Sequence, residues 1–145
     1  MTSKTYIPEG EQLRPAQSQI GNTLETLAGT IHARRSAGDK SYTYRLLTGD
    51  LDNLLKKLVE EAHETTLAAK DCDRPDAKPK DVDHLRYEAA DVVYHLMVLL
   101  EREGIALDEF AAELNARMTP EELSQNEGAI RLNPEYRNRG NHVEK

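Results

Sequence analysis

The chain has 145 residues, of which 38% are hydrophobic and 31% are charged, and its formal net charge is −7. This length favours a single domain, and the small supply of large apolar side chains favours a helical dimer that shares part of its core. The negative charge argues against nucleic-acid binding, which depends on basic surfaces, and no segment approaches the roughly 18 apolar residues of a membrane span.

Cysteine usage and the first residues indicate the compartment. Cys72 is the only cysteine, so an intrachain disulfide is impossible and a reducing environment fits the chain. The opening segment, MTSKTYIPEG, lacks the apolar stretch of a secretory signal. We therefore expect a soluble, cytoplasmic protein without a membrane partner.

The spacing of apolar residues predicts an all-α fold, an antiparallel helical bundle of about four main helices. We expect a polar arm at residues 1–19, a folded domain at 20–118 and a polar, mostly irregular tail at 119–145. The helices expected within the domain are a short piece at 41–49 and four longer ones at 20–36, 51–70, 82–103 and 109–117.

Turn and capping signals set the boundaries of these helices. Asp50 and Asp108 are suited to cap the helices that begin directly after them. Gly104 is suited to end the helix at 82–103. The segment 71–81, DCDRPDAKPKD, contains two prolines and is expected to be a loop.

The helix at 82–103 carries polar residues among apolar ones. In YEAADVVYHLMVLL (87–100), Glu88, Asp91 and His95 are spaced three and four apart, so they share one face. The rest of this segment is apolar, which predicts a helix buried on nearly every side. A buried pair of carboxylates is costly unless a cation, a basic side chain or water meets it.

A second acidic segment lies on the preceding helix. In KKLVEEAHE (56–64), Glu61 and Glu64 lie one turn apart, and Lys57 stands four residues before Glu61. Two antiparallel helices would bring these carboxylates to the acidic pair on the later helix. Such oxygen ligands suit Mg²⁺ or Mn²⁺ rather than zinc, and Mg²⁺ commonly shares its ligands with substrate phosphates. The two segments together indicate a metal site for a phosphoanhydride substrate.

Each feature also has a purely structural interpretation. Acidic residues spaced as in EExxE are common on solvated helix faces, and a carboxylate pair such as ExxD commonly pairs with Arg or Lys. A buried histidine such as His95 is more often hydrogen-bonded in a core than a ligand. Arg34 and Arg35 suit the negative end of a helix dipole, and Ser41 suits a helix cap.

Taken in order, the motifs resemble those of phosphoribosyl-ATP pyrophosphatases, within the MazG-like superfamily of all-α nucleoside triphosphate pyrophosphatases. EAADVVYHLMVLL is the most discriminating segment, because the wider superfamily shares only the acidic positions. The resemblance covers roughly residues 22–117, and its motifs are LETLAGTIHARR, SYTYRLL, KKLVEEAHE, AAK, EAADVVYHLMVLLEREGI and LDEFAAEL.

The resemblance implies hydrolysis of the α–β phosphoanhydride of 1-(5-phosphoribosyl)-ATP to 1-(5-phosphoribosyl)-AMP and pyrophosphate, the second step of histidine biosynthesis. It also implies a homodimer. By this resemblance the ligands of Mg²⁺, with Mn²⁺ as an alternative, are Glu61, Glu64, Glu88 and Asp91.

The resemblance further implies roles for residues around these ligands. Glu60, together with Glu61 and Glu64, is a candidate catalytic residue, either supporting a ligand or orienting water. Arg34, Arg35 and Lys57 are candidates for contacts with phosphate oxygens. The residues expected to line the substrate cleft are Ser41, Tyr42 and His95.

The chain departs from the family pattern where Val59 replaces a small residue, usually glycine, and in a longer loop at 71–81. These departures bear on the shape of the cleft and leave the acidic residues intact. Two other functions stay open: a housecleaning pyrophosphatase acting on ordinary or damaged nucleotides, and a helical dimer without catalytic activity.

Overall fold

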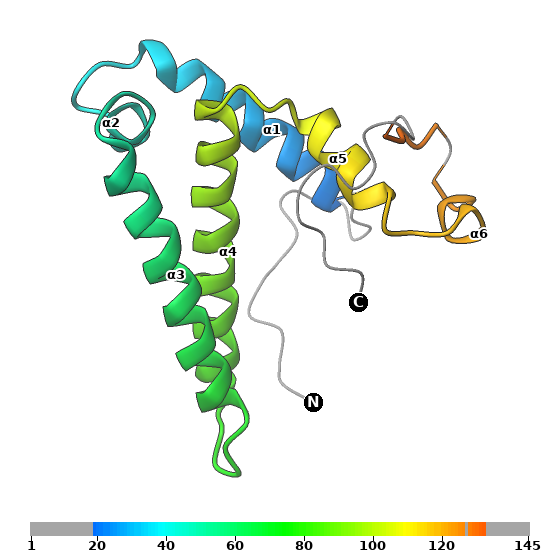
Figure 1. Cartoon of the computed structure of the whole chain (residues 1–145). Coiled ribbons are helices and arrows are strands. Elements are labelled where there is room, and N and C mark those ends of the chain that lie inside the picture. Colours follow the sequence, from blue (N-terminus) through cyan, green and yellow to red (C-terminus); the bar gives the residue numbers. More distant parts are fainter. Residues whose placement is uncertain (1–18, 127, 133–145) are drawn as a thin grey trace, which may run out of the picture. The chain divides into compact units, whose positions relative to one another are not determined.

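The computed structural model describes residues 19–126 and 128–132, and these residues form helices and turns without a strand (Figure 1). The all-α class predicted from the sequence is confirmed. Within these ranges no helix combines the length and the apolar character needed to cross a membrane. The helical elements are α1 (Gln19–Ala33), the 3₁₀ helix η1 (Arg34–Ser36), α2 (Tyr42–Thr48), α3 (Leu51–Cys72), α4 (Pro79–Arg102), α5 (Leu107–Asn115) and α6 (Pro120–Leu123).

The chain divides into two compact units, residues 1–103 and 104–145. Residues 1–18, most of the predicted arm, and residues 133–145 of the predicted tail lie outside the described ranges. The first unit holds α1 to α4 and every predicted site residue. In the second unit, the Asn115 side-chain amide at the end of α5 donates to the Ile130 carbonyl at 2.7 Å.

The predicted tail begins with a helical turn, α6, which the sequence analysis missed. The Thr119 hydroxyl accepts a hydrogen bond from the Glu122 backbone N–H, and the Glu122 carboxylate accepts one from the Thr119 N–H at 2.7 Å. Pro120 occupies the first helical position, where no backbone donor is needed. This reciprocal cap follows from the sequence TPEE, so the signal for the turn was present in the chain.

Two helices begin at other residues than predicted, because the residues that cap their N-termini were misidentified. α4 begins three residues early, at Pro79, because the Asp81 carboxylate accepts a hydrogen bond from the Lys78 N–H at 2.7 Å. α5 begins at Leu107, so Asp108 lies in its first turn rather than capping it. An acidic residue there still interacts favourably with the helix dipole.

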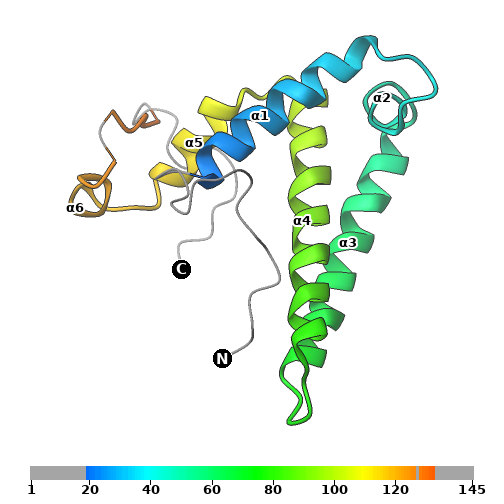
Figure 2. The ribbon, with the colours of Figure 1, turned by 180° about the vertical axis from the view of Figure 1, so that it is seen from behind.

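A long antiparallel hairpin of α3 and α4 forms the centre of the first unit (Figures 1 and 2). The buried positions on α3 recur every seven residues, at Leu54, Glu61 and Ala68. A seven-residue repeat keeps one side of a helix against its partner, so these positions define a seam. On α4 the buried residues include Glu88 and His95, which places the predicted polar line in this seam.

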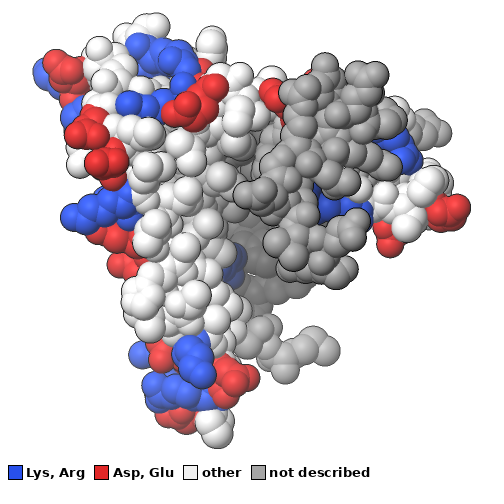
Figure 3. All heavy atoms as spheres, viewed as in Figure 1, with Lys and Arg blue, Asp and Glu red and all other residues white. Residues whose placement is uncertain are grey.

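The prediction that α4 is buried on nearly every side is wrong for the single chain. Val93 is 41% exposed and Ala89 is also exposed, and on α3 Val59 is 69% exposed. Ala89 follows the buried Glu88 by one residue, whereas Val59 and Val93 each lie two residues before a buried position, Glu61 and His95. Figure 3 shows a largely uncharged surface over α3 and α4, bounded by charged groups at both ends of the hairpin.

The apolar core of this unit lies where α1 and α2 meet the upper end of the hairpin. Ile31 of α1, Leu46 of α2, Leu54 of α3 and Val98 of α4 are at most 6% exposed. Each such side chain stabilises the fold by about 1.5–3 kcal/mol when it is fully buried. Arg102 of α4 also donates to the Leu46 carbonyl at 2.8 Å, which ties α2 to the hairpin.

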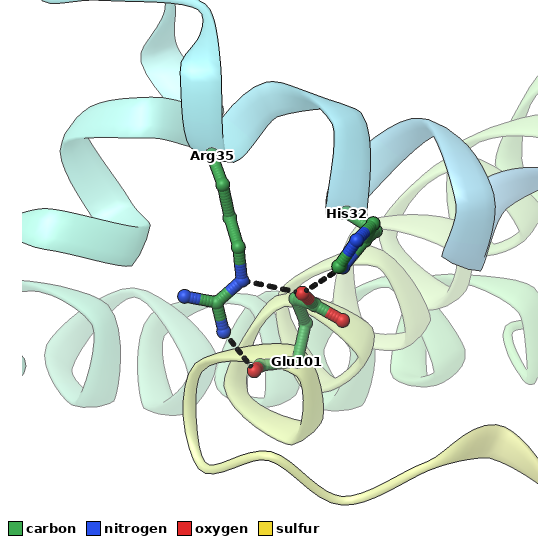
Figure 4. Close-up of polar contacts among 3 residues, drawn as sticks. All are labelled: His32, Arg35 and Glu101. Atoms are coloured by element: carbon green, nitrogen blue, oxygen red, sulfur yellow. Dashed lines mark hydrogen bonds and ion pairs between the residues drawn. The ribbon is translucent and has the colours of Figure 1, made fainter.

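A polar cluster joins the end of α1 to the end of α4 (Figure 4). The Glu101 carboxylate accepts hydrogen bonds from Arg35 Nε at 2.5 Å and His32 Nδ1 at 2.7 Å. Arg35 also donates to the Glu101 carbonyl at 2.5 Å. Burial alone would raise the pKa of the Glu101 carboxyl, but the hydrogen bonds and charges of Arg35 and His32 outweigh it, and the pKa lies below its usual value.

We expect Glu101→Gln to lower the free energy of unfolding by about 0.5–1 kcal/mol at pH 7, since the partly exposed ion pair is screened by solvent. A lowered pKa means that ionised Glu101 stabilises the fold above the ordinary glutamate range. This contribution is lost as pH falls through the lowered value. Urea unfolding at pH 7 and near pH 3 measures the difference. Glu103→Gln is the control, and equal losses in both variants would contradict the ion-pair role.

Candidate active site

Three carboxylates meet in the seam of the hairpin. Glu61 of α3 and Glu88 and Asp91 of α4 each offer an oxygen, and these oxygens lie within 4.8 Å of one another. Glu61 is 8% exposed and Glu88 is 7% exposed. The one-turn spacing on α4 and the antiparallel register of α3 bring together residues that are about 30 positions apart in sequence. We call Glu61, Glu88 and Asp91 the acidic cluster.

The acidic cluster is electrostatically unfavourable in the absence of a positive charge. Burial raises the pKa of the Glu61 carboxyl, and the charge of Asp91 raises it further. Glu64 adds to the same effect, while His95 opposes it. Buried like charges at this separation destabilise the fold unless a cation compensates them.

Glu88 provides the observation that most favours a cation. One oxygen, Oε1, accepts a hydrogen bond from His84 Nε2 at 2.9 Å. The other, Oε2, is buried and has no hydrogen-bond partner among the described residues. Buried carboxylate oxygens are nearly always satisfied, so an unpaired one beside two further carboxylates fits a missing ligand. Three carboxylates form an oxygen-only donor set, which suits a hard divalent cation.

The other two glutamates of the EExxE segment lie at the edge of the acidic cluster. Glu64 is exposed, one turn beyond Glu61, and is close enough to raise the pKa of Glu61. Glu60 faces basic side chains: its carboxylate lies 3.1 Å from Lys57 Nζ and 3.9 Å from Lys56 Nζ. The structure thus brings Glu61 together with Glu88 and Asp91, and it leaves Glu60 and Glu64 outside the three-membered cluster.

His95 is held inside the fold by both of its ring nitrogens. Nδ1 donates to the Asp91 carbonyl at 2.7 Å, and Nε2 lies 2.9 Å from the Tyr42 hydroxyl. The ring is 4% exposed, and Tyr94 packs edge-on against it at 5.2 Å between centroids. His95 therefore connects α2 to the backbone of a cluster residue, and its contact with a substrate stays a prediction.

A pocket of about 470 Å³ opens beside the acidic cluster, between α2 and the first half of α3. We call it the basic pocket because Arg45, Lys56 and Lys57 line it. Tyr42 links the pocket to the cluster, since its hydroxyl contacts His95. Burial raises the pKa of Tyr42, Lys57 lowers it, and the net shift is upward. The full lining comprises Tyr42, Arg45, Leu46, Asn53, Lys56, Lys57 and Glu60.

Four of the seven pocket residues were not among the predicted site residues. They are Leu46 and the polar residues Arg45, Asn53 and Lys56, all of which stand within or beside the motifs SYTYRLL and KKLVEEAHE. Asn53, Lys56 and Glu60 are three and four residues apart, so they share a face of α3. That spacing was readable in the sequence, but the approach of Arg45 from α2 was not.

Three of the predicted substrate-binding residues, Ser41, Arg34 and Arg35, are not among those that line the basic pocket. Ser41 caps α2 through a hydrogen bond from the Tyr44 N–H at 3.2 Å. Arg35 is engaged by Glu101, and Arg34 is exposed on η1 without a side-chain bond to a described residue. Substrate contacts by these three residues stay predictions.

The fold and the site define a class of protein: an all-α hairpin with a buried carboxylate cluster suited to a divalent cation and a basic pocket suited to an anion. Residues 24–118 match the family described as phosphoribosyl-ATP pyrophosphohydrolase. The chain belongs to this phosphoribosyl-ATP pyrophosphohydrolase family.

Curated relatives of this chain have names that agree with this family. A phosphoribosyl-ATP pyrophosphatase of Bradyrhizobium diazoefficiens is 41% identical over 104 residues, covering 71% of this chain and 91% of the relative. One from Pyrobaculum calidifontis is also 41% identical, over 67% of this chain and 96% of the relative. A histidine biosynthesis bifunctional protein of Halalkalibacterium halodurans is 36% identical, over 78% of this chain and 50% of the relative. No solved structure matches the chain.

We expect Glu61→Gln to raise the free energy of unfolding of the metal-free protein at pH 7, because it removes one of the like charges of the acidic cluster. The raised pKa means that ionised Glu61 destabilises the fold at neutral pH. This destabilisation is lost as the pH falls through the raised pKa and below the ordinary glutamate range, because Glu61 is then protonated. The difference in the free energy of unfolding between the variant and the wild type is lost with it. Urea unfolding in excess chelator at pH 7 and near pH 4 tests both statements.

Glu60→Gln is the matched control for this experiment, because Glu60 is adjacent in sequence and paired with lysines. It is expected to show no gain at pH 7. A Glu61→Gln variant that is no more stable than the wild type in chelator would contradict the electrostatic description of the acidic cluster.

Proposed function

We propose that this chain hydrolyses the α–β phosphoanhydride of 1-(5-phosphoribosyl)-ATP, giving 1-(5-phosphoribosyl)-AMP and pyrophosphate in the second step of histidine biosynthesis. The observation that carries the proposal is the acidic cluster with its unpaired Glu88 oxygen. Membership of the family and the names of the relatives supply the substrate.

We propose Mg²⁺, with Mn²⁺ as an alternative, as the cofactor, held by Glu61, Glu88 and Asp91 with Glu64 completing the set from one turn away. The donor chemistry supports this choice, since all four groups are carboxylates. Such a cation, when bound, offsets the charge of the substrate phosphates and lowers the pKa of bound water.

The chain's own residues position the reactants. Glu60 and Glu64 flank the acidic cluster and are candidates to orient the attacking water and accept its proton. Lys57 pairs with Glu60 at 3.1 Å from the side of the basic pocket. His95 fixes the Asp91 turn of α4 through the backbone and aligns Tyr42 beside it. Hydrolysis then depends on positioning and charge stabilisation, as is general for transfer at phosphorus.

Two other functions are distinguished by assay. A housecleaning pyrophosphatase would cleave free deoxynucleoside triphosphates at least as well as phosphoribosyl-ATP. A non-catalytic helical dimer would release no pyrophosphate from either. The basic pocket favours an enzyme over the non-catalytic alternative, because cations beside a carboxylate cluster suit a phosphorylated ligand.

We expect Asp91→Asn and Glu61→Gln each to lower pyrophosphate release from phosphoribosyl-ATP by at least about 100-fold, because each removes a charge from the site of metal binding. The wild type is expected to lose activity in chelator and to regain it with Mg²⁺. Asp76→Asn, in the exposed loop between α3 and α4, is the control. Full activity of Asp91→Asn, with folding verified by circular dichroism, would falsify the proposal.

We also propose a homodimer, formed through exposed apolar residues of the hairpin. Val59 of α3 and Val93 of α4 are 69% and 41% exposed. Large contiguous apolar surface on a single chain is typical of a site covered by another chain. A second copy of the hairpin would supply the apolar surroundings that the sequence of α4 predicted.

We expect Val59→Asp to convert the dimer to a monomer, since a charge at the centre of an apolar interface has no partner. Sedimentation equilibrium of the wild type and the variant measures the mass. Thr66→Asp, near the end of the hairpin, is expected to weaken the dimer less. A wild type that sediments as a monomer at high micromolar concentration would contradict this arrangement.

A further inference from the structure

The basic pocket has no role in the metal site and stands out by its charge. The chain as a whole carries a net charge of −7, yet three cationic side chains gather here against one carboxylate, Glu60. Lys56 has 76% of its side chain accessible and Lys57 has 44%, so the Lys56 ammonium in particular is available to a ligand. A local excess of positive charge on an acidic protein is suited to an anion.

Arg45 is pre-positioned in the wall of the pocket. Its Nη1 atom donates to the Asp39 carbonyl at 2.7 Å, and its guanidinium carbon lies 6.0 Å from the centre of the Tyr42 ring. A guanidinium carries five N–H donors, so most of its donors stay available when one is used. A fixed guanidinium can bind phosphate oxygens in a bidentate manner, whereas lysines contribute as point charges.

The basic pocket adjoins the acidic cluster rather than lying at a distance. Lys57 precedes Glu61 by four residues on α3, which corresponds to about 6 Å along the helix axis. Tyr42 lines the pocket and reaches His95, whose Nδ1 bonds the Asp91 carbonyl. A group bound in the pocket is therefore an immediate neighbour of a group bound at the cluster.

The proposed substrate carries two anionic parts, and they differ in their distance from the scissile bond. The β and γ phosphates follow the α–β anhydride directly. The 5-phosphate of the added ribose is separated from it by two riboses and the adenine ring. A pocket beside the acidic cluster therefore suits the β and γ phosphates.

We propose that the basic pocket binds the diphosphate half of the substrate, the part released as pyrophosphate, and that Arg45, Asn53 and Lys56 are substrate-binding residues in addition to Lys57 and Tyr42. This inference rests on the proposed function, whose phosphoanhydride substrate it assumes. It assigns the pocket to the reacting end of that substrate. It also gives Glu60 a second effect, because its carboxylate opposes the binding of an anion in the same pocket.

Kinetics distinguish a pocket that binds the diphosphate from one that binds a part of the substrate that does not react. Charge is redistributed on the diphosphate as the anhydride breaks, so contacts to this group are stronger in the transition state. Loss of such a contact lowers kcat. Loss of a contact to the distant 5-phosphate, which does not change during the reaction, raises KM instead.

The experiment measures binding and kinetics of Arg45→Gln and Lys56→Gln. In Mg²⁺, isothermal titration calorimetry with inorganic pyrophosphate is expected to show about tenfold weaker binding by each variant, the size expected for one charge-assisted contact. Binding of ribose 5-phosphate is expected to be unchanged. With phosphoribosyl-ATP, the variants are expected to lose mainly kcat.

Two further variants sharpen the test. Lys80→Gln neutralises an exposed lysine at the far end of the hairpin and is expected to bind pyrophosphate as the wild type does. Glu60→Gln is expected to bind pyrophosphate more tightly, because a competing carboxylate is removed. Thermal unfolding of every variant verifies that the fold is retained.

The proposal is overturned if the wild type does not bind pyrophosphate, or if Arg45→Gln and Lys56→Gln bind it as tightly as the wild type. It is also overturned if they weaken ribose 5-phosphate binding and raise KM alone, which would assign the pocket to the 5-phosphate. The binding assay needs no turnover of phosphoribosyl-ATP. Failure of the proposed function, seen as no release of pyrophosphate from that substrate, is thus recorded separately from failure of the pocket assignment.

Discussion

The placement of carboxylates in the buried seam of a helical hairpin is the constraint on which the rest of the structure depends. Glu61 and Glu88 occupy positions that an ordinary hairpin fills with apolar residues such as Leu54 and Ala68. A charge in such a position is tolerated only if other groups compensate it. The surrounding side chains supply part of that compensation. His84 contacts one Glu88 oxygen, and His95 partly opposes the rise in the pKa of Glu61 that burial and Asp91 cause. The remaining deficit is what a divalent cation would satisfy.

The elements around the hairpin hold this arrangement in register. α2 docks on α4 through three polar contacts: Tyr42 with His95, Thr43 with Tyr94, and the Leu46 carbonyl with Arg102. These contacts place the basic wall of the pocket beside the acidic cluster. The cluster of His32, Arg35 and Glu101 ties α1 to the same end of α4. The cations of the basic pocket and the carboxylates of the acidic cluster are thereby neighbours, so one phosphorylated ligand can contact both.

Exposed apolar residues on the hairpin explain why the burial that the sequence predicts for α4 differs from the burial in the single chain. The sequence of α4 predicts apolar surroundings on nearly every side, but Ala89 and Val93 are exposed. Sequence periodicity reports the environment in the functional assembly, whereas burial in one chain reports only contacts within it. A homodimer that covers these exposed residues would reconcile the two. Burial of these residues in a dimer would also stabilise the fold, since a chain with one Phe and no Trp has few large apolar side chains for its core.

The sequence by itself determined the all-α class, the four long helical segments and the acidic residues that matter, because helical periodicity and spacing are local properties. It left His95 open and did not indicate Arg45, Asn53 or Lys56. Only the tertiary structure decided that Glu61 lies in one cluster with Glu88 and Asp91, with Glu64 outside it. It also decided that Arg35 pairs with Glu101. Those outcomes depend on the register of two antiparallel helices and on the docking of α1 and α2, which are set by packing between distant segments.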